Sequence, residues 1–346
     1  MFDHAAYDNH ESVHHFNDPS RGLRAIIVIH STALGPGAGG CRMWDYPHGE
    51  AALRDCLRLS QGMSYKNAIA DLPLGGAKAV ILGDPRRNKT PALFEAFGEA
   101  VDALGGRYWS AEDVGVTPED LAHASAKTRY IAGLDQGAAA SGDPSPITAR
   151  GVFLGLKAAS ARVFGTEDLH KRSVVVQGVG HVGGALARLL AEAGARLVLS
   201  DVDQAGVAAL ADDLGAEVCA PDEVYEQDVD VFAPCALGAV INQGTLSRFK
   251  CKVIAGAANN QLIMPELGEL LRRRGILYAP DYVINGGGII NVAAEISGAY
   301  DADWVEGKLQ TLIQTLGAIL DEALASDLPP NEIADARARA ILQKGP

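Results

Sequence analysis

The chain has 346 residues, a length that predicts two domains and allows each a sizeable core. Hydrophobic residues make up 48% and charged residues 21%, which argues against disorder, and no apolar run approaches the roughly 20 residues of a membrane helix. The formal charge of −13 repels phosphate backbones, so nucleic acid is a poor partner.

The first half of the chain alternates predicted strands and helices. Apolar, β-branched runs predict strands at 23–30, 78–82 and 107–114, and helical spacing predicts helices at 50–70 and 91–104. Thr117, followed by Pro118, predicts a capped helix start. A turn-rich stretch at 133–146 predicts a hinge or mobile loop before a helix at 148–162.

The second half repeats this alternation. Its predicted strands are 173–177, 196–200, 230–233, 252–255 and 275–278, and its predicted helices are 184–193, 303–325 and 331–343. Strands that alternate with helices in both halves predict two α/β domains.

The compartment follows from the N-terminus and the cysteines. The first residues hold no basic segment followed by an apolar one, so we expect no secretory signal. The five cysteines form no CxxC pair, which argues against a disulfide framework and a zinc site. We therefore expect reduced thiols, no metal and a cytoplasmic location.

A dinucleotide-binding motif follows the predicted strand 173–177. Gly178 allows a tight turn, Gly180 lets backbone amides approach a pyrophosphate, and Gly183 lets the next helix pack closely on the strand. The predicted cofactor contacts of this motif are Gly178, Val179, Gly180, His181, Val182 and Gly183.

Asp201 ends the next predicted strand. A carboxylate there binds both ribose hydroxyls and repels a 2′-phosphate, which favours NAD over NADP. Asp203 could take the same role. The alternative interpretation is an ordinary turn followed by a surface aspartate.

Two lysines of the first half, Lys66 and Lys78, lie in apolar, glycine-rich surroundings. Most lysines are solvated surface charges, but Lys78 follows two glycines and enters an apolar strand. A lysine in an apolar cleft beside another cation gives up its proton more easily and can act as a base, while the other lysine binds a carboxylate. Asp113 follows a predicted strand, where catalytic groups are common, and Thr117 already supplies the cap of the next helix.

Several motifs, in order, resemble the Glu/Leu/Phe/Val amino acid dehydrogenases, and the leucine dehydrogenase branch most. They include LGPGAGGCRMW (34–44), LRLSQGMSYKNA (57–68), LPLGGAKAVILGDP (72–85), AEDVG (111–115) and GVGHVGG (178–184). Further matches are PITARGVFLGLKAA (146–159), FAPCALGAVIN (232–242), VIAGAANNQL (253–262) and ILYAPDYVINGGGIINVA (276–293). The resemblance implies NAD-dependent oxidative deamination of an L-amino acid to a 2-oxo acid and ammonia by a homo-oligomer.

The resemblance also implies the fold. It is α/β, with two domains around a cleft. An N-terminal domain that binds substrate and carries most oligomer contacts is expected at 1–135 plus the C-terminal helix at about 326–346. A Rossmann-type NAD-binding domain is expected at 136–325.

Residue roles follow from the same resemblance. It implies that Lys78 activates the attacking water, that Asp113 exchanges protons with the amino group, and that Lys66 binds the substrate carboxylate. Gly39 and Gly40 match a backbone turn beside that carboxylate, and Asn260 matches an asparagine near the amino group and the nicotinamide. The other implied cofactor contacts are Thr148, Cys235, Ala236 and Leu237.

The implied side-chain pocket is apolar: its positions are Ala38, Met63, Ala111, Ile289 and Val292. A γ-carboxylate would lack a basic partner there, so glutamate is disfavoured. Ala111 resembles the branched-chain enzymes, whereas the small Ala38 leaves room for a ring and Ile289 works against one. We predict leucine, valine and isoleucine as substrates, with phenylalanine or tryptophan as the alternative.

Two other classes stay open: a catalytically silent NAD-binding protein and a hydroxy-acid dehydrogenase. The first would have lost Lys66, Lys78 or Asp113, and the second would not need the two lysines. Gly286 replaces the alanine usual in the NAGG turn, and Cys41 replaces a threonine. Both are expected to alter loop rigidity near the pocket.

Overall fold

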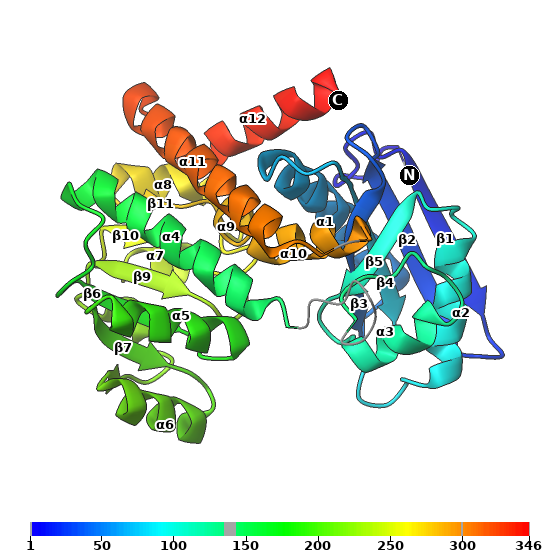
Figure 1. The fold of residues 1–346 in the computed structure, drawn as a ribbon, viewed down its shortest axis with the longest axis horizontal. Helices are drawn as coiled ribbons and strands as arrows, with labels where there is room; N and C mark the ends of the chain where they lie inside the picture. The colour runs from blue at the N-terminus through cyan, green and yellow to red at the C-terminus, as the bar shows by residue number, and fades with distance from the viewer. Residues whose placement is uncertain (1, 135–142, 299, 346) are drawn as a thin grey trace. The chain divides into compact units, whose positions relative to one another are not determined.

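The computed structural model describes residues 2–134, 143–298 and 300–345. They form two compact units, which are drawn in Figure 1. Unit 1 comprises Met1–Pro144, Ile289–Glu306 and Ala338–Pro346, and unit 2 comprises Ser145–Gly288 and Gly307–Arg337. In the described part of the chain, no helix is long and apolar enough to cross a membrane. Most of the predicted hinge at 133–146 lies outside the described residues.

The units do not follow the division expected from the sequence. Ile289–Glu306, expected in the second domain, belongs to unit 1, and most of the C-terminal helix, expected in the first, belongs to unit 2.

Unit 1 is built on a five-stranded mixed sheet in the order β1-β2-β4-β3-β5. Its strands are β1 (Ser12–Asp18), β2 (Leu23–Ser31), β3 (Gly37–Trp44), β4 (Gly75–Leu82) and β5 (Tyr108–Glu112). Strand β3 runs parallel to its neighbours β4 and β5, whereas β2 is antiparallel to β1 and β4. The carboxyl ends of three neighbouring strands therefore meet at one edge.

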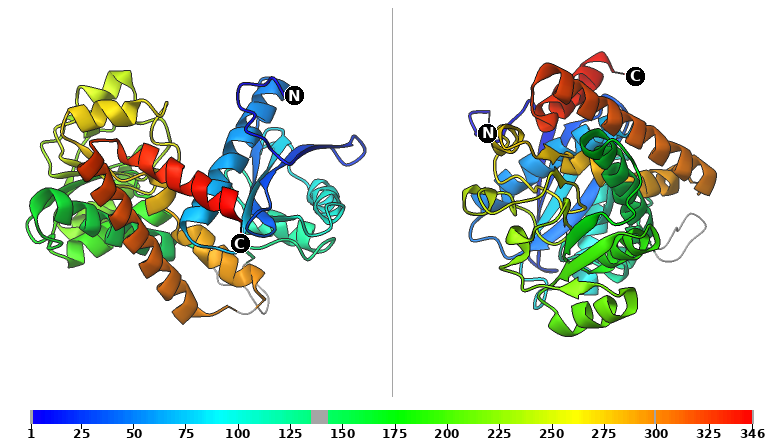
Figure 2. Two further views of the ribbon diagram at one scale, coloured as in Figure 1. Left: turned by 90° about the horizontal axis from the view of Figure 1, so that it is seen from above. Right: turned by 90° about the vertical axis from the view of Figure 1, so that its left-hand side faces the viewer.

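Helices cover both faces of this sheet (Figure 2). They are α1 (Gly49–Ile69), α2 (Pro91–Asp102) and α3 (Pro118–Ser125). On β2, Ile26 and Val28 pack toward α1, while Ile27 and Ile29 pack toward α2 and α3, the alternation expected of a strand buried on both faces. The predicted start of α3 is confirmed, because Thr117 and Asp120 form a capping box there.

Unit 2 is built on a six-stranded sheet whose neighbouring strands are all parallel, in the order β11-β10-β9-β6-β7-β8. The strands are β6 (Ser173–Gln177), β7 (Arg196–Ser200), β8 (Glu217–Val218), β9 (Val231–Pro234), β10 (Val253–Ile254) and β11 (Leu277–Tyr278). The chain leaves β6 for β7 on one side and later returns to β9 on the other. Ligands bind at such a switch point, outside the carboxyl ends of the strands.

The helices of the second half complete the fold. They are α4 (Ser145–Phe164), α5 (His181–Glu192), α6 (Gln204–Leu214), α7 (Gln243–Leu246), α8 (Leu267–Arg273), α9 (Asp281–Ile284), α10 (Gly287–Ile296), α11 (Ala302–Ser326) and α12 (Pro330–Lys344). Within unit 2, α4 and α5 pack side by side, as Figure 1 shows. The predicted α/β class with two domains is confirmed.

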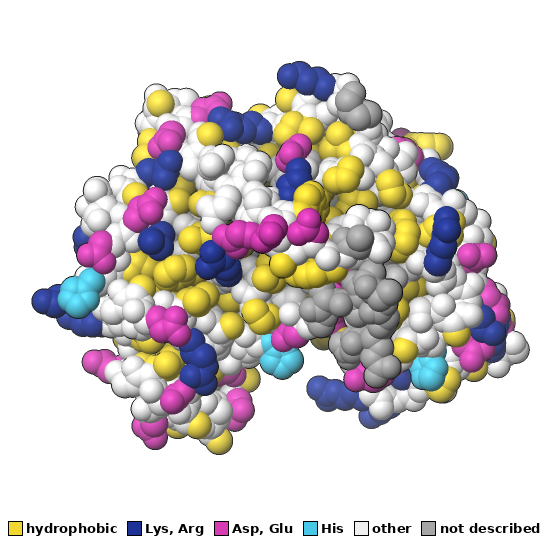
Figure 3. Space-filling model, viewed as in Figure 1, with side chains coloured by type: hydrophobic (Ala, Val, Ile, Leu, Met, Phe, Trp, Pro, Cys, Tyr) yellow, Lys and Arg dark blue, Asp and Glu magenta, His cyan; other side chains and the backbone are white. Residues whose placement is uncertain are grey.

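Surface charge is mixed in sign. Figure 3 shows acidic and basic side chains interspersed on the face that it presents. An ion pair joins α4 to α11, because Arg162 Nη2 lies 2.8 Å from Asp321 Oδ2.

Candidate active site

Lys78 and Asp113 form a buried ion pair in unit 1. Lys78 lies on β4 and Asp113 comes directly after β5, and the distance from Lys78 Nζ to Asp113 Oδ2 is 2.5 Å. Only 7% of the Lys78 side chain and 17% of the Asp113 side chain are exposed. The two residues that the sequence singled out for proton transfer are therefore in direct contact.

Arg42, which the sequence analysis did not single out, is the second cation on Asp113. Its Nε lies 3.3 Å from the same Oδ2 atom that Lys78 contacts. Burial alone would raise the pKa of Asp113, but the charges of Lys78 and Arg42 outweigh it and hold that pKa well below its ordinary value. Asp113 is therefore ionised at neutral pH.

Gly39 and Gly40 lie inside β3 and not in a turn. A Cβ atom on Gly39 would lie 2.0 Å from the carbonyl oxygen of Ala77, and one on Gly40 would lie 2.3 Å from that of Glu112. Glycine at both positions therefore lets β3 approach its neighbours beside the ion pair.

Met63 and Lys66 share one face of α1, because they are three residues apart. Met63 Cγ lies 3.0 Å from the place that a Cβ atom on Gly39 would take, so this face of α1 meets β3. Helix α1 is held there by the Asn67 side chain, which donates to the Gly75 carbonyl at 2.6 Å. Lys66 is half-buried.

All five candidates for the side-chain pocket belong to unit 1. Ala38 and Ala111 are buried in β3 and β5, while Ile289 and Val292 are half-buried on one face of α10. A hydrogen bond of 2.6 Å from Gly133 N to Glu295 Oε2 ties α10 to the segment that follows α3. A Cβ atom on Gly133 would lie 3.8 Å from that of Ala111, so this tie lies beside the end of β5.

The glycine motif of unit 2 lies at the switch point of the sheet. Gly178 has φ +89°, and a Cβ atom there would lie 2.7 Å from the side chain of Ala236, in the loop after β9. A Cβ atom on Gly183 would lie 1.9 Å from the Gly178 carbonyl oxygen, so the start of α5 touches the turn. The motif and the predicted loop 235–237 are thus in contact.

The amino end of α5 suits a pyrophosphate. Gly180 is the N-cap and offers no side chain to the free backbone N–H groups, and no acidic residue lies in the first turn. Apart from its chain neighbours, no atom of the described residues lies within 4 Å of the place that a Cβ atom on Gly180 would take. The residues present therefore fit a dinucleotide, whose phosphates Gly180, His181 and Val182 would hold through their backbone.

Asp201 and Asp203 have different roles. Asp201 Oδ2 accepts a hydrogen bond of 2.7 Å from Val179 N, which places its carboxylate at the glycine turn. Asp203 caps α6 by accepting from Gly206 N at 3.1 Å. This geometry favours Asp201 as the ribose ligand.

Asn260 lies in the loop after β10, exposed and with φ +51°. Its carbonyl accepts from Ala239 N at 2.7 Å, which joins this loop to the one after β9, where Leu237 is 81% exposed. Asn285, a residue that the sequence analysis missed, donates to Asn259 Oδ1 at 2.7 Å and holds the same loop from α9.

Thr148 lies on α4 beside the triple glycine 286–288, at the start of α10. A Cβ atom on Gly288 would lie 3.0 Å from Thr148 Oγ1. Gly286 stands where the family resemblance leads us to expect alanine. A Cβ atom there would lie 2.8 Å from Leu312, so glycine allows α11 to pack closely. The other departure, Cys41, is a fully buried thiol in the core of unit 1, and all five cysteines are free.

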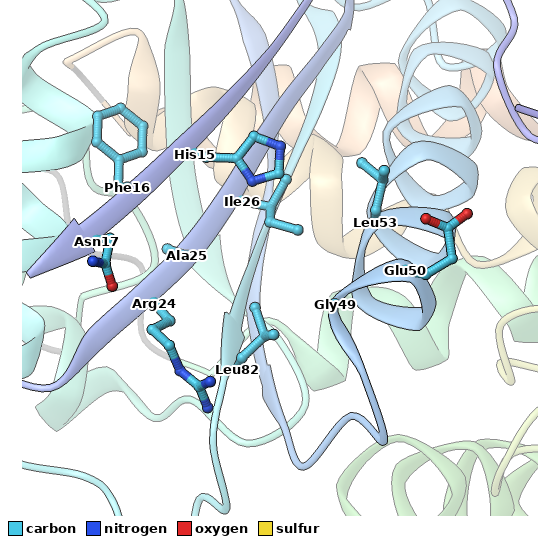
Figure 4. Close-up of a pocket in the computed structure, with 10 residues that line it drawn as sticks. All are labelled: His15, Phe16, Asn17, Arg24, Ala25, Ile26, Gly49, Glu50, Leu53 and Leu82. Carbon is cyan, nitrogen blue, oxygen red and sulfur yellow. The ribbon is translucent and has the colours of Figure 1, made fainter. Parts of the chain in front are cut away.

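A pocket of about 360 Å³ lies elsewhere in unit 1 (Figure 4). Strands β1, β2 and β4 and the start of α1 form it, with Phe16, Ile26 and Leu53 among its apolar lining. It shares no residue with the ion pair or the predicted side-chain pocket, so we assign it no part in catalysis.

The fold and these two groups of residues define an amino acid dehydrogenase. The family model described as Glu/Leu/Phe/Val dehydrogenase, dimerisation domain, matches residues 10–130, and the model described as Glutamate/Leucine/Phenylalanine/Valine dehydrogenase matches residues 199–320. The chain belongs to this family, whose members are generally NAD(P)-dependent.

Two curated relatives and one solved structure illustrate the similarity. The leucine dehydrogenase of Bacillus subtilis (strain 168) is 45% identical over 99% of this chain and 94% of its own. The phenylalanine dehydrogenase of Bacillus thermotolerans is 49% identical over 84% of this chain and 77% of its own. The crystal structure of L-tryptophan dehydrogenase from Nostoc punctiforme has a TM-score of 0.83 and 41% identity, and covers 97% of this chain and 96% of that one.

Proposed function

We propose that this chain catalyses the reversible, NAD-dependent oxidative deamination of an apolar L-amino acid to its 2-oxo acid and ammonia. The observation that carries this proposal is the buried contact between Lys78 and Asp113, at 2.5 Å. An amine and a carboxylate in contact can divide the proton transfers of this reaction between them. One group exchanges a proton with the attacking water, and the other exchanges a proton with the substrate nitrogen.

Each of the three polar residues has one task. Lys66 binds the substrate carboxylate. Asp113, which is ionised, accepts a proton from the substrate ammonium group. When bound, NAD would supply the oxidation, as the acceptor of the hydride that leaves the α-carbon. Lys78 gives up its own proton to solvent before the next step, and as a neutral amine it takes a proton from the water that adds to the resulting iminium. Asp113 then returns its proton to the nitrogen, and ammonia leaves as the new hydroxyl group loses its proton to solvent and forms the carbonyl.

NAD is the proposed coenzyme because of Asp201. Its carboxylate lies at the glycine turn, where it can accept from both ribose hydroxyls and would repel a 2′-phosphate.

The apolar candidates for the side-chain pocket support a branched-chain substrate. All five lack a charge that could pair with a γ-carboxylate. Similarity to leucine dehydrogenases at 45% identity favours leucine, valine and isoleucine. The second candidate is an aromatic substrate, favoured by the small Ala38 and by the similarity to phenylalanine and tryptophan dehydrogenases. Apolar pockets discriminate by only about 1–3 kcal/mol per methylene, so either substrate class fits this lining.

We also propose that unit 1 associates with a second copy of the chain, because residues 10–130 match a domain described as a dimerisation domain. Light scattering after size exclusion measures the mass directly. A mass of 36.2 kDa at micromolar concentration would contradict this proposal.

The deciding experiment measures NAD reduction at alkaline pH with leucine, valine, isoleucine, phenylalanine, tryptophan, glutamate and alanine. Turnover led by the branched-chain acids supports the whole proposal. A lead by phenylalanine or tryptophan keeps the reaction and replaces the substrate class. No turnover on any of them by protein that still binds NAD would overturn the proposed reaction.

A further inference from the structure

Arg42 joins the candidate proton-transfer pair to a second carboxylate. Asp113 Oδ2 lies 2.5 Å from Lys78 Nζ and 3.3 Å from Arg42 Nε. The other arm of the guanidinium, Nη1, donates to Asp55 Oδ2 on α1 at 3.0 Å. That same oxygen accepts from the Tyr46 hydroxyl at 2.6 Å. The five side chains form one continuous chain of polar contacts.

The strand register explains why two cations meet at one oxygen. Arg42 pairs with Val80 on the parallel strand β4, two residues beyond Lys78. Lys78, Val80 and Arg42 share one face of the sheet, and Val80 packs in the cluster that α1 covers. Two cations at diagonal positions on one buried face repel each other unless an anion lies between them. Asp113 is that anion.

The guanidinium is held on both sides. Only 20% of the Arg42 side chain is exposed, and its planar fork is shared between Asp113 and Asp55. The two cations and two carboxylates balance in charge, which lowers the cost of burying all four. Arg42 therefore has one carboxylate partner at Nε and another at Nη1, whereas Lys78 is paired with Asp113.

The proposed reaction makes this arrangement useful, because the buried Asp113 must be ionised to accept a proton from the substrate ammonium group. Lys78 is then needed at the reacting water, so a second cation beside Asp113 has a role of its own. We propose that Arg42 is a positioning residue that holds the Asp113 carboxyl group in place and keeps it ionised before that proton transfer. This inference rests on the proposed function for its place in the cycle.

The other titratable groups near Asp113 do not offer the same support. Cys41 on β3 and Tyr108 on β5 belong to the core on the other face of the sheet, and burial raises the pKa of each well above its ordinary value, so both are neutral. Asp120 on α3, which contributes at Cys41, is paired with Lys89. Asp55 acts on Asp113 only through Arg42. Among the described neighbours, Lys78 and Arg42 are the cations in contact with Asp113.

The test compares Arg42→Gln, which removes the charge, with Arg42→Lys, which keeps it. Exposed Arg58 on α1 provides the matched control, Arg58→Gln. For Arg42→Gln we expect the acid limb of the kcat/KM profile to move up by about one pH unit or more, since one nearby opposite charge lowers a carboxyl pKa by about 1–3 units. We expect kcat to fall more than the KM for amino acid changes. Arg42→Lys should restore the position of the limb.

A second readout does not depend on turnover. Infrared difference spectroscopy follows protonation of the Asp113 carboxyl, with the band assigned by its loss in Asp113→Asn. In Arg42→Gln the carboxyl should protonate at a pH at least about one unit higher than in the parent enzyme. If Arg42→Gln does not fold, the double variant Arg42→Lys, Tyr46→Phe replaces it. This variant keeps a positive charge at position 42, so its Asp113 carboxyl must protonate at the parental pH.

Failure of the role of Arg42 and failure of the proposed reaction give different results. A parental acid limb and a parental infrared titration in Arg42→Gln would overturn the role of Arg42, even if the enzyme is active. An inactive parent enzyme whose Asp113 titration still shifts in Arg42→Gln would refute the proposed reaction and leave the electrostatic role of Arg42 standing.

Discussion

Gly40 and Asp113 are so close that a Cβ atom on Gly40 would lie 2.9 Å from the Cβ atom of Asp113. Alanine at position 40 would therefore push the carboxylate away from Lys78. A displacement of about 1 Å at reacting groups can cost 100-fold in rate. We expect Gly40→Ala to lose about 100-fold in kcat/KM and to bind NAD as the parent enzyme does, by fluorescence titration.

Gly62→Ala is the matched control for this prediction. Gly62 lies on α1, and outside the local backbone of that helix a Cβ atom there would meet no atom of the described residues within 4 Å. Because alanine favours a helix over glycine by about 1 kcal/mol, this variant should be active and slightly more heat-stable. Equal activity of the two variants would refute the steric argument.

Lys78→Ala should remove turnover and leave coenzyme binding intact. Loss of a positioned acid–base group costs about 10²- to 10⁴-fold in kcat. The control is Lys89→Ala, which breaks the ion pair of Lys89 with Asp120 elsewhere in unit 1. We expect that control to retain most of its kcat, because Lys89 pairs with Asp120 and not with Asp113. A Lys78→Ala enzyme with parental kcat would rule out the proposed base.

Asp201→Asn should relax the preference for NAD over NADP. The amide oxygen can still accept from Val179 N, so the turn is kept while the negative charge is removed. We expect the ratio of kcat/KM values for the two coenzymes to fall by about tenfold or more, since a specific repulsive contact is lost.

Asp203→Asn removes the same charge two residues away. Asparagine caps a helix as well as aspartate does, so α6 should be unaffected and the coenzyme ratio unchanged. A similar change in both variants would mean that general surface charge, and not Asp201, sets the preference.

Stability should fall as the pH is lowered from about 6.5 to about 4. Burial lowers the pKa of His10 to about 4 from an unfolded value of 6.5. Its ring accepts from Asp8 N and shares a hydrogen bond with the Leu57 carbonyl, and the pKa of buried His30 is lowered too. The unfolded chain therefore takes up protons in this window that the folded chain does not, and unfolding is favoured as pH falls.

Differential scanning calorimetry at pH 7.5 and pH 5 checks this prediction. His10→Gln cannot take up the proton, so its Tm should fall less between the two values than that of the parent enzyme. His15→Gln, at an exposed position on β1, is the control and should behave as the parent does. An equal fall in all three proteins would show that other groups govern acid stability.

The sequence predicted the parallel sheet of unit 2 well, because strands buried on both faces are continuous apolar runs. It did not reveal β1 or β3. Strand β1 lies at the sheet edge and has a polar sequence, SVHHFND, without clear alternation. Strand β3 begins GAGG, which we interpreted as a turn, whereas its glycines allow backbone contact with neighbouring strands.

Arg42 could not be found by motif because its partner lies 71 residues away. The one available signal was a charged residue inside the apolar stretch CRMW, which implies a buried counter-charge without naming it. Asn285 was missed for a similar reason, since only the folded loops bring it to Asn259.

The chain passes between the two units four times, at 144/145, 288/289, 306/307 and 337/338. Three of these junctions fall inside α10, α11 and α12. No single cut therefore separates unit 1 from unit 2, and neither unit can be made as one uninterrupted fragment. An engineer who wishes to graft the coenzyme preference of a relative onto this enzyme must exchange residues 145–288 and 307–337 together. The junctions inside α10, α11 and α12 must keep the helical register on both sides.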